Sequence, residues 1–307
     1  MSYIDDIKKL AETTSMTNRE IAEALGCSRR TVRRVAGPQR KRKGVDEVRM
    51  PKILLFDIET LPMECYIWQL FKNVVLPHQM IKDWSMLTWS AKWLFEDTII
   101  SDSVSGAEAV DREDLSILVT LWSLLDQADI VIAHGAHRFD IPRSNARFMH
   151  YGMLPPSPYQ VIDTLTALKK VSWPSSYKLE FINKFLQLEQ LKGDSNFSMW
   201  KRAAKGDEKA IDDMLRYNQQ DVVALEDLYL RIRPWIKSHP NVGTYLESEE
   251  PVCPNCGNED LIWQGHYHTP AGRYQAFRCE NCGAIGRSRF SDLDKENRKM
   301  LCLSTAR

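Results

Sequence analysis

The segment ILLFDIETLP, residues 53 to 62, constrains the fold of this chain more than any other stretch. Four apolar residues precede Asp57, and such a run is typical of a buried β-strand. Side chains alternate between the two faces of a strand, so Asp57 and Glu59 point to one face while Ile58 points to the other. Two carboxylates at one spot repel each other unless a cation lies between them. The segment therefore predicts a buried strand that ends either at a metal site or at a solvated strand end, and the rest of the chain has to decide between the two.

Length and composition indicate a soluble protein with one large core and small accessory modules. The chain has 307 residues, of which 43% are hydrophobic and 27% charged. No apolar run approaches the roughly 18 to 20 residues of a membrane span, and the start MSYIDDIKKL lacks the apolar core of a signal peptide. We expect a cytoplasmic protein with no membrane partner.

The formal net charge of zero hides an uneven distribution of charge. Lys and Arg outnumber Asp and Glu by 12 to 7 in residues 1–50 and by 8 to 6 in residues 251–307, whereas residues 51–250 carry 21 against 28. Basic modules suit a polyanion. An acidic middle region that must approach a polyanion needs divalent cations to neutralise it.

Residues 1–37 form a small basic module. In TNREIAEALGCSRRTVRRVAG, Thr17 and Glu20 provide a capping box for one helix, Gly26 ends that helix and Ser28 caps the next. The pattern resembles a helix-turn-helix that binds duplex DNA, with a small helical adaptor as the alternative. The candidate DNA contacts are four arginines of the second helix: Arg29, Arg30, Arg33 and Arg34. Residues 38–50, which include the run RKRK, form a basic linker.

Residues 51–240 alternate between strand and helix patterns. The strand candidates are residues 52–59, segments within MLTWSAKW and TIISDSV, residues 129–135 and residues 159–163. The helix candidates are residues 111–127, 141–152, 177–186 and 208–236. This order predicts an α/β domain with a mixed β-sheet flanked by helices.

Three further residues join the candidate site. Asp140 follows the strand DIVIAHG in the segment HGAHRFDIP, at a strand-to-helix junction. Asp221 lies four residues after Tyr217 on the last long helix, so the carboxylate and the phenol share one helical face.

The order of these motifs resembles a known superfamily. DIET, then FD after a strand, then YxxxD on a late helix is similar to the DEDD superfamily of 3′–5′ exonucleases with an RNase H-like fold, in the subgroup whose third motif carries tyrosine. The resemblance covers roughly residues 52–240 and is closest to exonuclease subunits of phage or prophage origin that are related to polymerase proofreading domains. A phage-encoded protein of this kind would act in the host cytoplasm.

The resemblance implies roles for the five residues. Asp57, Glu59 and Asp221 would hold the metal on the nucleophile side, and Asp57 and Asp140 the metal on the leaving-group side. Tyr217 would orient the attacking water. Two divalent ions can stabilise both the attacking and the leaving oxygen, and oxygen-only ligands favour Mg²⁺ or Mn²⁺.

The second motif departs from the family pattern. The family usually has HNGxxFD, whereas this chain has Gly135 and Ala136 in place of Asn and Gly. The lost amide puts substrate positioning and rate in doubt. We expect His134 and His137 to be structural or to face the substrate, and Asp163 to cap a helix at a strand end.

The cysteines indicate a zinc module at residues 251–290, followed by a tail at residues 291–307. Cys253 and Cys256 are separated by 22 residues from Cys279 and Cys282, and alternating stretches flank the turn TPAG between the pairs. Two CxxC knuckles joined by a hairpin are typical of a structural zinc ribbon with four thiolate ligands. Its arginines are candidate nucleic-acid contacts: Arg273, Arg278, Arg287 and Arg289.

These patterns favour a metal-dependent 3′–5′ exonuclease on DNA that takes a single-stranded 3′ end at its active site. The implied partners are DNA and a DNA polymerase or other replication protein. A 3′–5′ exoribonuclease is one alternative, because nothing visible reads the 2′-hydroxyl. A DNA-binding regulatory or recombination protein with a weakened nuclease core is the other.

Overall fold

The computed structural model describes residues 49–69, 71, 74–188 and 196–303. Contacts divide the chain into two units, Met1–Glu47 and Val48–Arg307. The helix-turn-helix predicted at residues 1–37, with its four arginines, and most of the linker predicted at residues 38–50 lie outside the described residues. In the described ranges, no helix combines the length and the apolar character needed to span a membrane.

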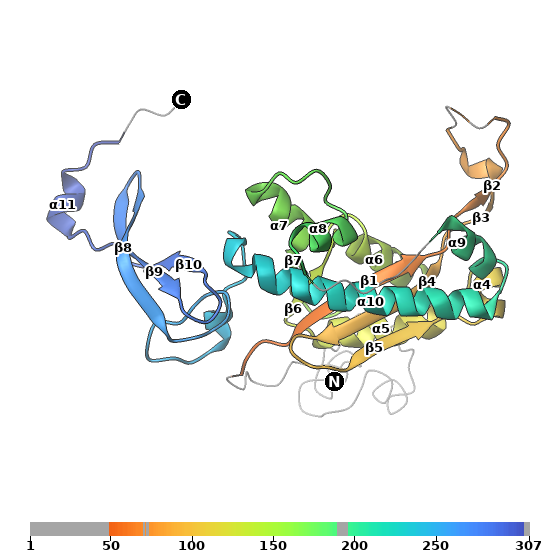
Figure 1. The fold of residues 1–307 in the computed structure, drawn as a ribbon, viewed down its shortest axis with the longest axis horizontal. Coiled ribbons are helices and arrows are strands. Elements are labelled where there is room, and N and C mark those ends of the chain that lie inside the picture. Colours follow the sequence, from red (N-terminus) through yellow and green to blue (C-terminus); the bar gives the residue numbers. More distant parts are fainter. Residues whose placement is uncertain (1–48, 70, 72–73, 189–195, 304–307) are drawn as a thin grey trace, which may run out of the picture. The chain divides into compact units, whose positions relative to one another are not determined.

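A five-stranded mixed sheet with the order β5-β4-β1-β6-β7 forms the centre of the larger unit (Figure 1). The central strand β1 pairs antiparallel with β4 and parallel with β6; β5 is antiparallel to β4, and β7 is parallel to β6. The strands are β1 (Ile53–Thr60), β4 (Met86–Trp93), β5 (Ile99–Ser103), β6 (Ile130–Ala133) and β7 (Gln160–Asp163). The prediction of a mixed sheet flanked by helices is confirmed.

Seven helices of this region surround the sheet in the described residues. They are α4 (Gly106–Asp111), α5 (Leu115–Gln127), α6 (Asp140–His150), α7 (Thr164–Val171), α8 (Leu179–Phe185), α9 (Phe197–Ala203) and α10 (Glu208–Ile232). The predicted helix at residues 111–127 is wrong at its start, because Arg112 has a left-handed φ of 63° that ends α4 before α5 begins. The predicted helix at 208–236 is four residues too long, because Pro234 has no N–H to donate and the chain turns into the 3₁₀ helix η2 (Arg233–Trp235).

The two faces of β1 pack against different helices. Leu54 and Phe56 share a buried cluster with Leu118 and Leu121 of α5. Ile53 and Leu55 belong to another buried cluster. Its members on α10, which runs along the sheet in Figure 1, include Val222, Leu225 and Leu228. The odd-numbered face of β1 therefore faces α10, and residues 57 and 59 continue that face.

Smaller elements complete the structure. A two-stranded hairpin of β2 (Glu64–Cys65) and β3 (Met80–Lys82), with the 3₁₀ helix η1 (Pro77–Gln79), follows β1 and was not predicted. Beyond the 3₁₀ helix η3 (Val242–Tyr245), β8 (Leu261–Thr269), β9 (Gly272–Cys279) and β10 (Ile285–Arg287) form a three-stranded sheet in the order β10-β9-β8. The predicted hairpin around TPAG is the connection between β8 and β9. The short helix α11 (Lys295–Lys299) follows.

Candidate functional site

The carboxyl-terminal half of β1 places two carboxylates on the face of the sheet that packs against α10. Asp57 and Glu59 are half-buried, whereas Ile58 between them is 2% exposed. Asp57 pairs with Ser90 and Glu59 with Thr88 of β4, and the register shifts directly after Glu59. The alternation predicted from the sequence is therefore present, and it directs both acids toward α10.

Helix α10 brings a third carboxylate to the same place. Val222 and Leu225 pack against the apolar part of β1, and this packing carries Asp221 toward the polar part. Carboxylate oxygens of Asp57, Glu59 and Asp221 all lie within 4.8 Å of one another. Asp221 lies 164 residues after Asp57 in the chain, and the two meet because β1 carries apolar residues before its acids while α10 carries Asp221 before its apolar residues.

Asp140 is the first residue of α6 and lies beside this group. Its side chain is 1% exposed, and its Oδ1 has no hydrogen-bond partner among the described residues. The negative charge of Asp140 raises the pKa of both Asp57 and Glu59, so the four carboxylates form one electrostatic cluster. A buried carboxylate oxygen without a donor is costly, and a bound cation would satisfy it.

Burial disfavours ionisation of all four carboxyl groups, and repulsion from the other members of the cluster adds to it for Asp57 and Glu59. Burial is the largest cause for Asp57, whose pKa is raised well above its usual value, and the charges of the other three groups add to it. Burial and the charges of Asp221 and Asp140 raise the pKa of Glu59 to about 8. Burial likewise raises the pKa of Asp140 to about 7 and that of Asp221 to about 6. Bound divalent cations would reverse these shifts by favouring the ionised forms.

Two side chains of α10 form hydrogen bonds with carboxylates of this cluster. The hydroxyl of Tyr217 hydrogen-bonds to Asp221 and opposes the rise of its pKa. Nδ2 of Asn218, which is fully buried, donates to Oδ2 of Asp57 at 2.6 Å. Sequence reasoning missed Asn218, although its position three residues before Asp221 puts it on the same helical face.

The loop before Asp140 is held by Asp163, at the end of β7. The Asp163 carboxylate accepts backbone N–H groups of Gly135 at 3.2 Å, of His137 at 3.3 Å and of Thr166 at 3.0 Å. Burial opposes ionisation, but these N–H groups outweigh it and lower the pKa of Asp163. The expected helix cap is confirmed, since Asp163 caps α7. It also shapes the loop that follows β6, which the sequence did not reveal.

The residues of the altered second motif, Gly135 and Ala136, fit the local backbone and packing. Gly135 has a φ of +104°, a region that glycine enters without strain. Ala136 is completely buried. His134 is structural, because its ring bonds to the Thr164 hydroxyl at 2.9 Å and to the carbonyl of Tyr177 at 2.7 Å.

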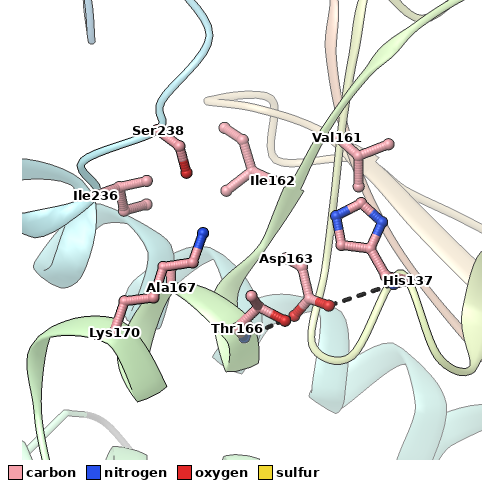
Figure 2. A pocket seen from close by; sticks show the side chains of 9 residues that line it. All are labelled: His137, Val161, Ile162, Asp163, Thr166, Ala167, Lys170, Ile236 and Ser238. Atoms are coloured by element: carbon pink, nitrogen blue, oxygen red, sulfur yellow. Dashed lines mark hydrogen bonds between the residues drawn. The ribbon is translucent and has the colours of Figure 1, made fainter. Parts of the chain in front are cut away.

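A small polar cavity lies beside this loop, and none of the four carboxylates lines it (Figure 2). Its volume is about 50 Å³, which suits one or a few water molecules. Asp163 lines it together with His137, Thr166 and Lys170, and the dashed lines in Figure 2 mark the hydrogen bonds of Asp163. The cavity is too small for a nucleotide, so we do not assign it to substrate.

The four predicted zinc ligands come together in the carboxyl-terminal module. Their sulfur atoms lie within 4.8 Å of one another, and the Sγ–Sγ distances Cys253–Cys282 and Cys256–Cys279 are both 3.6 Å. A disulfide would require about 2.05 Å, whereas a tetrahedral zinc with Zn–S bonds of about 2.3 Å sets sulfurs about 3.8 Å apart. The Cys253 thiol donates to Cys256 and lowers the pKa of Cys256 to about 4, whereas this bond raises the pKa of Cys253, and burial raises the pKa of Cys282 to about 11. A bound cation would favour the thiolate form of all four. The residues fit a closed four-thiolate site.

Comparison with known proteins agrees with the fold. Residues 101–233 match a family described as the RNase_H superfamily. The match contains Asp140, Tyr217 and Asp221, while Asp57 and Glu59 precede it. No curated protein sequence matches the chain. Together with the mixed five-stranded sheet and its flanking helices, the match supports an RNase H-like fold and suggests a nuclease-type function on nucleic acid.

Proposed function

We propose that this protein is a 3′–5′ exonuclease that hydrolyses DNA with the help of two divalent metal ions. The observation that carries the proposal is the meeting of Asp57, Glu59 and Asp221 within 4.8 Å, beside the buried oxygen of Asp140 that has no described partner. Four carboxylates gathered at a partly buried site repel one another and do not stabilise the fold by themselves, and they suit hard divalent cations such as Mg²⁺ or Mn²⁺.

Each residue has a role in this proposal. Asp57, Glu59 and Asp221 would hold one cation, and Asp57 and Asp140 would hold the other. When bound, the two ions stabilise the attacking and the leaving oxygens of the scissile phosphate. Tyr217, whose hydroxyl already bonds to Asp221, orients the attacking water and helps to take its proton. Asn218 holds the Asp57 carboxylate in one orientation through its hydrogen bond to Oδ2, so that the shared ligand would already be oriented when the two ions bind.

The zinc site supports folding in this proposal. Four thiolates leave zinc no open position for water or substrate, so the ion does not take part in hydrolysis. Amide Nδ2 of Asn281 donates to Sγ of Cys256 at 3.6 Å, as expected for a group that stabilises a thiolate ligand.

The test compares short single-stranded DNA and RNA with a label at either end, in Mg²⁺ or Mn²⁺. We expect a ladder from 5′-labelled DNA and a labelled mononucleotide from 3′-labelled DNA. Asp57→Asn should reduce the rate at least about 10²-fold, because both ions lose a shared ligand. The matched control Asp97→Asn lies at an exposed turn and should cleave at the wild-type rate.

Three results would contradict the proposal. Equal cleavage rates of wild type and Asp57→Asn would show that the carboxylate cluster does not take part in the reaction. Degradation of RNA alone would favour the exoribonuclease. No cleavage of either polymer by the folded protein would favour a binding or regulatory protein.

A further inference from the structure

The three-stranded sheet has two chemically different faces. Directly paired residues point to the same face, and Tyr267 pairs with Tyr274, Ile262 and Ile285 both pair with Arg278, and Arg287 pairs with Ala276. We call these seven residues the tyrosine–arginine face. The opposite face carries Leu261, Trp263, Phe277 and Cys279 and packs toward the four cysteines.

The tyrosine–arginine face is open to solvent. Tyr267 is 53% exposed and Ile285 67% exposed, and the side chains of Arg278 and Arg287 are also exposed. The guanidinium carbon of Arg287 lies 3.9 Å from the centre of the Tyr274 ring and 5.8 Å from that of Tyr267. The Arg287 guanidinium thus lies against the partly exposed ring of Tyr274, and its Nη1 donates to the carbonyl of Ser288 at 3.1 Å. This places an exposed cation close to the exposed ring of Tyr267.

The charge of this face has one sign. Among the residues of β8, β9 and β10 there is no Asp or Glu. The nearby Asp292 binds His266 and Arg273, which belong to the opposite face, at 3.1 Å each. Arg273 is therefore paired, which leaves Arg278, Arg287 and Arg289 of the four ribbon arginines expected to contact phosphate, and the first two lie on the tyrosine–arginine face.

We propose that the tyrosine–arginine face binds single-stranded DNA. Unpaired bases stack on Tyr267 and on the guanidinium plane of Arg287, while Arg278 and Arg287 contact phosphates. A duplex hides the faces of its bases, so the exposed ring of Tyr267 beside two arginines favours a single strand. The face would hold the strand while its 3′ end is degraded, so the choice of DNA rests on the proposed function.

The test measures the binding of a fluorescent oligothymidylate of about 30 nucleotides to the full chain by anisotropy. Divalent cations are omitted so that no strand is cleaved, and excess unlabelled duplex occupies any duplex site. We expect Tyr267→Ala combined with Arg287→Ala to weaken binding at least about tenfold, since a stacked base and a phosphate contact are lost. Arg278→Ala should weaken binding, and the slope of the logarithm of the binding constant against the logarithm of the salt concentration should become shallower by about one unit, since one phosphate contact is lost.

The matched control is Arg273→Ala, an arginine of the same sheet on its other face. Its affinity should change less than about twofold, because Arg273 already binds Asp292. Retention of zinc by each variant shows that the sheet remains folded. If the double variant loses zinc, Arg278→Ala decides the matter alone.

The inference is overturned if the zinc-containing double variant binds as tightly as wild type, or if Arg273→Ala weakens binding equally. If the chain binds oligouridylate more tightly than oligothymidylate, and the same variants lose that binding, then RNA and not DNA is the ligand of this face. Cleavage is scored separately: a chain that binds the strand through this face but cleaves nothing refutes the proposed function and leaves this inference standing.

Discussion

Replacing Glu59 by glutamine should stabilise the protein in the absence of Mg²⁺ while it removes a proposed metal ligand. Glutamine keeps the shape of the side chain but cannot ionise beside Asp57 and Asp221. The pKa of Glu59 is raised from 4.5 to about 8, so the folded state binds this proton more tightly than the unfolded state. The stabilising effect of the proton is complete below pH 4.5 and is lost as pH rises through about 8.

The magnitude follows from the pKa difference. Each pKa unit corresponds to about 1.4 kcal/mol, so the ionised group would cost the Mg²⁺-free fold up to roughly 5 kcal/mol above pH 9. Glu59 is half-buried, and water that reaches it screens part of this cost, so we expect about 2 kcal/mol. That is about 4–8 °C in the unfolding temperature of a domain of this size.

Thermal unfolding at pH 5 and pH 9 in Mg²⁺-free buffer measures the effect. Glu59→Gln should unfold at a higher temperature than wild type at pH 9, and the difference should shrink at pH 5. Mg²⁺ should stabilise wild type more than the variant, because it binds the ionised cluster. The exposed control Glu96→Gln should show neither change. Equal unfolding temperatures of wild type and Glu59→Gln at pH 9, or a gain that is the same at both pH values, would refute this reasoning.

Three other outcomes are expected. Tyr217→Phe should bind Mg²⁺ and DNA normally but lower kcat about 10²-fold in the oligonucleotide assay, since only the hydroxyl is lost; an unchanged kcat would exclude it from proton transfer. Asn218→Ala should raise the Mg²⁺ concentration needed for half-maximal cleavage by about tenfold, because Asp57 loses its amide donor, and a fall in rate with no shift in Mg²⁺ dependence would speak against this positioning role. Cys253→Ser with Cys256→Ser should abolish the retention of one Zn²⁺ per chain in elemental analysis after dialysis while cleavage of short DNA persists; retained zinc would rule out the four-thiolate site.

Features that depend on near neighbours in the chain were predictable. The alternation in FDIET placed Asp57 and Glu59 on one face because a strand has a period of two. The CxxC spacing predicted four gathered sulfurs, and Asp163 was recognised as a helix cap. The end of α10 was predicted less well: the apolar pattern continues to residue 236, but the helix ends at Ile232, because Pro234 has no backbone N–H to donate.

Tertiary structure decided which distant groups meet. The sequence shows Asn218 as one polar residue among many on a long helix, and only the packing of α10 on β1 brings its amide to Asp57. The sequence also shows four similar arginines in the ribbon, and only the strand register separates Arg273 from Arg287. Local rules settle the direction of a side chain within its own element, because they depend on backbone geometry alone. The partner across the sheet is settled by how apolar faces fit together, and that depends on the whole chain.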